Sequence, residues 1–209
     1  TKIICDRADA ILKGPVGAPK YDDIKDVNLR PERGGVLALR ARYNTFANIR
    51  PVKLPVELKD FSPLKPEIIP NGIDIVIVRE LMGGIYFGKK EEGLMPDGEP
   101  YAMDVMQYTS SQVEAIARVA FREAADRNVI LHNIHKSNVL KCSIFWNAIV
   151  EEINRNEFPQ VKLENMLVDT AAYKLVLEPG RFNVMLLENM MGDILSDEAG
   201  GIIGSLGLM

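Results

Sequence analysis

The sequence predicts an α/β fold, built on mixed sheets whose faces are covered by helices. The first observation is a series of short apolar runs rich in β-branched residues, of which residues 73–78 (IDIVIV) are the most continuous. Such runs are expected of buried strands. The second observation is that these runs alternate with segments of helical spacing, such as residues 110–127. This alternation is typical of parallel or mixed α/β sheets.

The elements before residue 73 are short. Residues 8–12 (ADAIL) are expected to form a strand that ends at the turn of residues 14–17 (GPVG), because Gly and Pro favour turns. Residues 21–31 are polar and predict a loop. Residues 35–43 predict a short helix, and residues 47–54, which are extended and flanked by proline, predict a strand.

The later elements follow the buried run at 73–78. Residues 89–100 are charged and contain Gly and Pro, so they predict a protruding loop. A helix is expected over 110–127, capped by Ser110 or Ser111. Its inner stripe is expected to comprise Val113, Ile116, Ala117 and Ala120. The remaining elements are expected at 129–134 (strand), 139–157 (helix), 161–168 (strand), 170–177 (helix), 182–187 (strand) and 192–203 (helix).

Composition narrows the class of protein. The chain has 209 residues, 47% of them hydrophobic, and a formal net charge of −4, which argues against a basic nucleic-acid-binding surface. No apolar run approaches the roughly 18 residues that span a membrane. Cys5 and Cys142 lie far apart, which fits a reducing compartment, the cytoplasm or an organelle matrix. The chain begins at Thr1 and ends in an apolar, Gly-rich run, so we expect a fragment that lacks both flanks of its fold.

Two carboxylates in the last predicted helix form the most informative pattern. Asp193 and Asp197 are four residues apart, just after the apolar run 182–187, so on a helix both side chains share one face. Like charges this close repel unless a cation lies between them. A hard divalent cation such as Mg²⁺ or Mn²⁺ satisfies such a pair through oxygen ligands. The alternative is a solvated acidic first turn, where the helix dipole favours Asp.

Other side chains suited to catalysis or ligand binding lie at the ends of predicted strands. Arg79 ends the strand at 73–78, where a buried charge needs a partner. Lys136 and Asp169 follow the next two predicted strands. Ligands of open α/β sheets bind at the carboxyl ends of the strands, so we expect these residues and the Asp pair to meet at one edge.

Arginines and a tyrosine complete the set of candidates. Arg40, Arg50 and Arg79 lie at the ends of predicted elements, and arginine forks are the usual way to hold a substrate with several carboxylates. Tyr86 lies in a Gly-flanked turn. A Tyr and a Lys, here Lys136, are a suitable pair for proton transfer.

Six stretches of the chain carry a resemblance to a known family. They are residues 30–34, 46–51, 62–65, 78–88, 136–140 and 188–199, and the last (ENMMGDILSDEA) is highly specific. Through them the chain resembles the β-decarboxylating dehydrogenases, the group that holds 3-isopropylmalate, isocitrate, homoisocitrate and tartrate dehydrogenases. Within that group it is most similar to the 3-isopropylmalate enzymes. The resemblance implies an isocitrate/isopropylmalate dehydrogenase-like fold with a β-arm for dimerisation, of which this chain holds the central portion.

The resemblance also implies roles in substrate binding and catalysis. Arg40, Arg50 and Arg79 match the arginines that bind the malate carboxylates. Tyr86 and Lys136 match the acid–base pair. The implied reaction is the oxidative decarboxylation of (2R,3S)-3-isopropylmalate to 2-oxo-4-methylpentanoate and CO₂ with NAD⁺, a step of leucine biosynthesis.

Cofactor and partner follow from the same resemblance. Three residues match the family's ligands of Mg²⁺ or Mn²⁺: Asp169, Asp193 and Asp197. Asn138 matches a residue near the nicotinamide of NAD. Family members are homodimers with shared active sites, so Lys136 and Asp169 would reach the site of the other subunit. Residues 84–109 would form the arm that clasps the partner.

Substrate choice is expected to depend on the helix that follows Pro31. Val36 and Leu37, with Val139 from the facing subunit, offer an apolar lining that suits an isopropyl group. The alternative is that Val36 and Leu37 are core residues. His135 stands where isopropylmalate enzymes usually carry Asp and also occurs in isocitrate-type relatives, so tartrate, homoisocitrate and isocitrate remain alternative substrates.

The domain plan completes the expectations. Residues 1–48 would belong to the first, cofactor-side domain, 49–198 to a central domain for substrate, metal and dimerisation, and 199–209 to the return into the first domain. Since both flanks are expected to be missing, the 209 residues alone are expected to be inactive. A catalytically incomplete dimerising fragment and a metal-binding module of another class remain competing interpretations, and the choice between NAD and NADP stays open.

Overall fold

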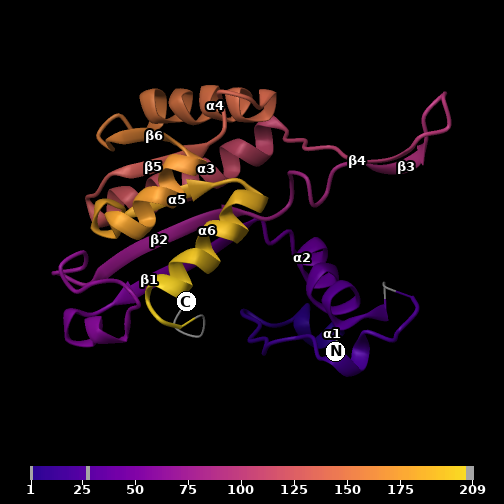
Figure 1. Ribbon diagram of the computed structural model, residues 1–209, viewed down its shortest axis with the longest axis horizontal. Helices are drawn as coiled ribbons and strands as arrows, with labels where there is room; N and C mark the ends of the chain where they lie inside the picture. The colour runs from indigo at the N-terminus through magenta and orange to yellow at the C-terminus, as the bar shows by residue number, and fades with distance from the viewer. Residues whose placement is uncertain (1, 27–28, 206–209) are drawn as a thin grey trace. The chain divides into compact units, whose positions relative to one another are not determined.

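The computed structural model describes residues 2–26 and 29–205 of the chain. The chain divides into two compact units, Thr1–Thr45 and Phe46–Met209 (Figure 1). The expected domain boundaries at residues 48 and 198 concern a longer fold and stay predictions.

The first unit contains short helices. In chain order they are α1 (Lys2–Cys5), η1 (Pro19–Tyr21), η3 (Pro31–Leu37) and α2 (Ala38–Tyr43). The strand expected at residues 8–12 is wrong, because these residues are irregular and no strand neighbours them in the described part of this unit. The helix expected at 35–43 is confirmed. It begins earlier, at Pro31, as a π-helical turn that continues into α2, and proline is well suited to a first helical turn.

The second unit is built on a five-stranded sheet in the order β1-β2-β7-β5-β6 (Figure 1). Its strands are β1 (Ala47–Leu54), β2 (Ile73–Glu80), β5 (Leu131–His135), β6 (Leu163–Leu167) and β7 (Val184–Leu187). Strand β1 runs antiparallel to β2, and all other neighbours are parallel. The predicted mixed sheet is therefore confirmed.

Helices cover both faces of this sheet. Successive side chains of a strand point to opposite faces, so Ile75 and Ile77 of β2 join one core and Val76 and Val78 join another. The first core includes side chains of α5 (Val168–Leu177) and α6 (Asn189–Ile202), and the second those of α3 (Ser110–Arg127) and α4 (Lys141–Glu157). Because apolar residues are needed on both faces, β2 has the nearly continuous apolar sequence expected of a central strand.

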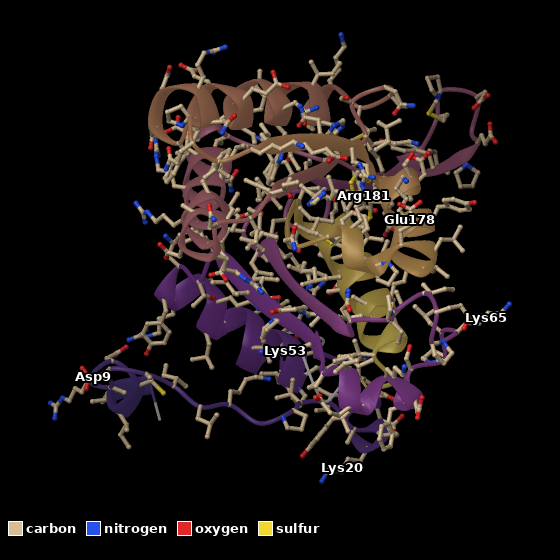
Figure 2. All side chains as sticks on the ribbon, turned by 90° about the vertical axis from the view of Figure 1, so that its left-hand side faces the viewer. Asp9, Lys20, Lys53, Lys65, Glu178 and Arg181 are labelled. Atoms are coloured by element: carbon tan, nitrogen blue, oxygen red, sulfur yellow. The ribbon has the colours of Figure 1, made fainter. Side chains whose placement is uncertain are left out.

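Short turns and ion pairs complete this unit. They include η4 (Val56–Phe61) after β1 and η5 (Pro179–Arg181) between α5 and β7. Glu178 and Arg181 lie side by side in Figure 2, with Arg181 Nη1 4.0 Å from Glu178 Oε2. Arg181 also pairs with Glu164 on β6, so this ion pair ties the turn to the sheet.

A hairpin projects from the second unit (Figure 1). Its strands, β3 (Lys90–Leu94) and β4 (Pro100–Asp104), pair antiparallel in a sheet of their own. The prediction of a loop over residues 89–100 is therefore wrong for the first half of this range, which forms β3. The β-arm implied by the family resemblance is present. The strand was hidden because its side chains are mostly charged and exposed, so it lacks the apolar alternation that identifies a half-buried strand.

Helix starts differ from the expected ones for a clear chemical reason. The N-cap of α3 is Thr109, not Ser110 or Ser111: Thr109 Oγ1 accepts the backbone N–H of Gln112, and Gln112 Oε1 accepts that of Thr109 at 2.9 Å. This is a capping box. Helix α6 begins at Asn189, three residues earlier than expected. None of the helices within residues 2–26 and 29–205 is both long and apolar enough to cross a membrane.

Candidate active site

The carboxyl ends of four parallel strands lie at one edge of the sheet. Strands β2, β7, β5 and β6 run in the same direction, so Arg79, Glu188, Lys136 and Asp169 all lie at or just beyond the same edge. The antiparallel strand β1 contributes from its amino end, where Asn48 pairs with Arg79 in the ladder. The topology therefore brings these groups to the edge where α/β sheets bind ligands.

Arg79 is a buried cation with several fixed partners. Its side chain is 4% exposed, and Nη1 forms an ion pair with Asp193 Oδ1. Its Nε and Nη2 donate to the side-chain oxygen of Asn189 at 3.2 and 2.8 Å. A buried charge is stable only when it is paired and hydrogen-bonded, and these contacts meet that requirement.

Tyr86 completes the surroundings of Asp193. Its hydroxyl donates to Asp193 Oδ2 at 3.1 Å from the turn between β2 and β3. Partial burial raises the pKa of Tyr86 above its ordinary value, and the hydrogen bond to Asp193 raises it further. The hydroxyl therefore keeps its proton across the neutral range and can donate it.

Asp197 is held by the second arginine. Arg50 Nη1 lies 3.1 Å from Asp197 Oδ1 and 2.6 Å from Ser196 Oγ, while its Nε donates to Asn48 Oδ1 at 2.8 Å. Asp193 and Asp197 are thus each paired with a guanidinium. Their mutual repulsion, which the sequence suggested a metal ion would relieve, is relieved here by two arginine side chains.

Lys136 and Asp169 form a separate ion pair. The two side chains are joined through Lys136 Nζ and Asp169 Oδ1, and the Lys136 ammonium holds the pKa of Asp169 below its usual range. The turn after β5 is fixed by Ser143, whose hydroxyl accepts the backbone N–H of Lys136 at 3.1 Å. Asn138 and Val139 follow on this turn with exposed side chains.

The third expected metal ligand is set apart from the other two. Strand β5 lies between β7 and β6 in the sheet, which places about 10 Å, or two strand spacings, between the strands that lead to Asp193 and Asp169. In the described residues no three His, Cys, Asp or Glu side chains gather as a metal site requires. One copy of the chain therefore brings together Asp193 and Asp197 and leaves Asp169 beside Lys136.

The remaining expected site residues belong to the first unit. Val36 and Leu37 are half-buried in η3, and Arg40 is half-buried in α2. Their burial within short helices is compatible with either core or lining residues, and their assigned roles stay predictions.

A buried polar network behind Arg79 was missed in the sequence. Tyr108, which precedes α3, donates its hydroxyl to Glu188 Oε2 at 3.0 Å. Glu188 caps α6 by accepting the N–H groups of Met190 and Met191. Burial raises the pKa of the neighbouring Glu80, whose carboxylate accepts two backbone N–H groups. The available signal was a run of polar residues (Glu188, Asn189) directly after a buried strand.

Comparisons with known proteins agree with this arrangement. A family model described as isocitrate/isopropylmalate dehydrogenase matches residues 1–209. The chain is 47% identical over 211 residues to a 3-isopropylmalate dehydrogenase of Symbiobacterium thermophilum, which covers 100% of this chain and 56% of that protein. It is 49% identical over 210 residues to a 3-isopropylmalate dehydrogenase of Bacillus licheniformis, with the same coverage.

The fold is similar to a solved structure of the same kind. The crystal structure of isocitrate dehydrogenase from Methylococcus capsulatus superimposes with a TM-score of 0.71 at 32% identity, covering 94% of this chain and 52% of that one. The chain spans little more than half the length of the curated relatives it matches. Since the family model covers every residue, the chain belongs to the isocitrate/isopropylmalate dehydrogenase family.

Proposed function

We propose that the protein to which this chain belongs catalyses the NAD-dependent oxidative decarboxylation of (2R,3S)-3-isopropylmalate to 2-oxo-4-methylpentanoate and CO₂. The observation that carries the proposal is the placement of Asp193 between Arg79 and Tyr86, with Asp197 beside Arg50 one helical turn away. Carboxylate-binding groups, oxygen ligands and a proton donor thus lie together at the ligand-binding edge of the sheet.

Arg50 and Arg79 bind the substrate carboxylates. Both guanidinium groups are oriented by neutral side chains, Asn48 and Ser196 for Arg50 and Asn189 for Arg79. Arg50 and Arg79 each contact a carboxylate through Nη1, that of Asp197 and that of Asp193 respectively, which supports a role in binding substrate carboxylates. Arg40 keeps its proposed place as the third arginine of the set.

The donor set of α6 fits a hard divalent cation. Asp193 and Asp197 present carboxylate oxygens from one face, and their side chains are 37% and 63% exposed, so both are accessible to Mg²⁺ or Mn²⁺. Asp169 completes the set from a second copy of the chain. NAD⁺, when bound, would supply the hydride acceptor for this chemistry, and the divalent cation would supply a Lewis acid.

Two side chains move protons. The Lys136 amine accepts the proton of the substrate hydroxyl. The protonated hydroxyl of Tyr86 donates a proton to the substrate carbon after CO₂ has left. Lys136 and Asp169 act as a pair in the site of the partner subunit, which is why they are set apart from Asp193 within one chain. Asn138, exposed on the turn after Lys136, contacts the nicotinamide.

An apolar lining selects the isopropyl group. Val139 is 70% exposed at the tip of its turn and is proposed to reach the partner's pocket, where it would join Val36 and Leu37. A second candidate substrate is isocitrate or a related hydroxy acid. It is favoured by His135, which lies next to Lys136 in the chain, and by the similarity to a solved isocitrate dehydrogenase.

The test uses the full-length protein with NAD⁺ and Mn²⁺. NADH formation is followed with 3-isopropylmalate, isocitrate, homoisocitrate and tartrate in separate reactions, and the D193N variant serves as a matched inactive control. The proposal expects kcat/KM to be highest for 3-isopropylmalate. A higher value for isocitrate would transfer the assignment to the second candidate, and turnover of none of them would support a catalytically incomplete dimerising protein.

A further inference from the structure

We propose that Asn189 and Gly192 are positioning residues that together fix the direction of the Arg79 guanidinium. The inference rests on the proposed function, in which Arg79 holds a substrate carboxylate. Asn189 and Gly192 are three residues apart in the first turn of α6, so both positions lie on the same face of the helix. The Arg79 side chain lies against that face.

Asn189 binds the guanidinium of Arg79. Its amide oxygen accepts from Arg79 Nε at 3.2 Å and from Nη2 at 2.8 Å, while its amide nitrogen donates to the backbone oxygen of Gly83 at 3.0 Å. The side chain is 1% exposed. Because one end must accept and the other must donate, the amide fits in one orientation only, and neither a carboxylate nor an apolar side chain reproduces both contacts.

Further hydrogen bonds fix the backbone of Asn189. The backbone N–H of Asn189 donates to the hydroxyl of Tyr108 at 3.0 Å, and that hydroxyl donates to Glu188. The Glu188 carboxylate also caps the first turn of α6. The amide of Asn189 therefore projects from a helix start whose backbone donors are satisfied, which limits its freedom to follow movements of Arg79.

Gly192 leaves space for the aliphatic part of the Arg79 side chain (Cβ, Cγ and Cδ), which we call its stem. A Cβ at this position would lie 2.6 Å from Arg79 Cγ, 3.0 Å from its Cβ and 3.1 Å from its Cδ. These atoms belong to the part of the side chain nearest the backbone of β2, so they cannot swing away as a flexible tip can. The stem of Arg79 thus runs against the bare backbone of α6, and any larger residue at 192 would redirect it.

The two contacts matter most when Asp193 leaves Arg79. In the proposed reaction Asp193 turns its oxygens to a divalent cation, so its ion pair with Arg79 is weakened. The hydrogen bonds that Arg79 donates to Asn189 Oδ1 remain, because this acceptor is a neutral amide that is not among the proposed ligands of the cation. They leave the guanidinium aimed at the edge of the sheet, ready for a substrate carboxylate.

The test compares variants of the full-length protein. N189L removes the hydrogen bonds of Asn189, and G192A fills the space beside the aliphatic part of Arg79. N189D keeps the acceptor for Arg79 and loses the donor to Gly83. N133L and G180A are the controls. Asn133 is an equally buried amide that bonds Asn147, Asn165 and Trp146 instead. Among the described residues other than its chain neighbours, no heavy atom lies within 4 Å of the position that a Cβ at residue 180 would take.

The expected result is a split between KM and stability. KM for the malate substrate should rise roughly tenfold or more in N189L and G192A, the scale of one lost hydrogen bond to a charged group. N189D should fall between N189L and the parent. N133L should lower Tm while KM stays at the parental value, and G180A should change neither. G192A should also lower Tm, because the added Cβ would lie 2.6 Å from the buried stem of Arg79 and overpacking is destabilising.

Two outcomes overturn the proposal. One is a parental KM in G192A, and the other is an N189L variant whose KM changes no more than that of N133L. If the parent turns over no malate, the proposed function fails and the positioning role is tested by NMR instead. The Nε–H signal of Arg79, assigned by its loss in R79K, should be protected from exchange in the parent and unprotected in N189L. Equal protection in both refutes the positioning role of Asn189.

Discussion

Tyr86 donates its hydroxyl hydrogen to Asp193 Oδ2 at 3.1 Å while Asp193 Oδ1 faces Arg79. One carboxylate therefore links a proton donor to a carboxylate-binding arginine. Arg79 on β2 and Tyr86 in the turn that follows it are close in the sequence, whereas Asp193 on α6 is 114 residues from Arg79 and 107 residues from Tyr86.

Removing the hydroxyl of Tyr86 should slow the reaction with little effect on binding. Y86F keeps the ring and loses the proton donor, so kcat of the full-length enzyme should fall by roughly 10²-fold, the usual scale for a positioned acid–base group. Steady-state kinetics measure kcat and KM separately. Y173F, which alters an exposed tyrosine on α5, should retain the parental kcat, and equal loss in both variants would contradict the role of Tyr86.

Asp193 should be needed for metal binding. D193N keeps the size of the side chain and removes the charge that attracts Mg²⁺ or Mn²⁺, so calorimetry should show Mn²⁺ affinity several-fold lower than in the parent. D126N, which removes an exposed carboxylate on α3, is the matched control and should bind Mn²⁺ as the parent does. Unchanged affinity in D193N would remove Asp193 from the ligand set. Chelation with EDTA should abolish activity in the parent, and added Mn²⁺ should restore it.

Lys136 should act as more than a positive charge. K136M should lower kcat by roughly 10²-fold or more while substrate affinity falls far less, because an acid–base group is lost. K136R keeps the charge and the ion pair with Asp169 but replaces an amine that can lose its proton with a guanidinium that cannot. Rate measurements on both variants decide the role, with K53M on β1 as the control. If K136R keeps most of the activity, the general-base role must be abandoned in favour of charge alone.

Prediction from sequence worked where a pattern depends on burial. The continuous apolar run of β2, the alternation of strands and helices, and the inner stripe of α3 all reflect the side that faces a core, and each is confirmed. Prediction failed where a strand depends on a neighbouring strand and not on burial. Residues 8–12 have no neighbouring strand in the described part of their unit, whereas the charged strand β3 pairs with β4 in a hairpin.

The candidate site divides in the same way. The spacing of Asp193 and Asp197 and the strand-end positions of Arg79 and Lys136 are visible in sequence, because each depends on local geometry alone. The contribution of Asn189 is not visible, because its meaning lies in what its amide touches on β2 and in the turn at Gly83. The roles assigned to these residues stay predictions for the experiments described here.

The full-length protein should be a homodimer built through the arm, α4 and α6. Large apolar side chains are exposed on both helices, with Ile144 at 50% on α4 and Ile194 at 60% on α6, as expected of a surface that a partner covers. I194D should therefore weaken the dimer, because association would bury an unpaired charge. Sedimentation at micromolar concentration measures this, with L58D on η4 as the control. A parental monomer at that concentration would refute the dimer and, with it, the shared active site.

Acid should destabilise the protein through its buried histidines. His132 is 1% exposed, its ring contacts Phe182 edge-on, and burial lowers its pKa below 6.5 although Glu164, 3.8 Å away, opposes the shift. Arg181, which pairs with Glu164, also disfavours a charged His132. The folded state thus binds fewer protons than the unfolded state at pH values near and below 6.5. The stability contributed by neutral His132 is complete above that pH and is lost as pH falls below it.

Chemical unfolding at about pH 7.5 and about pH 5.5 measures the effect. The parent should lose stability over this window, and H132M, which keeps an apolar side chain of similar size, should lose less. The window lies above the ordinary range of Asp and Glu, but Glu80 and Glu198 have raised pKa values through burial and contribute with the opposite sign. His135, whose pKa burial also lowers, remains in both proteins. The difference between parent and H132M cancels these groups, so equal pH dependence in the two would exclude His132 as the source.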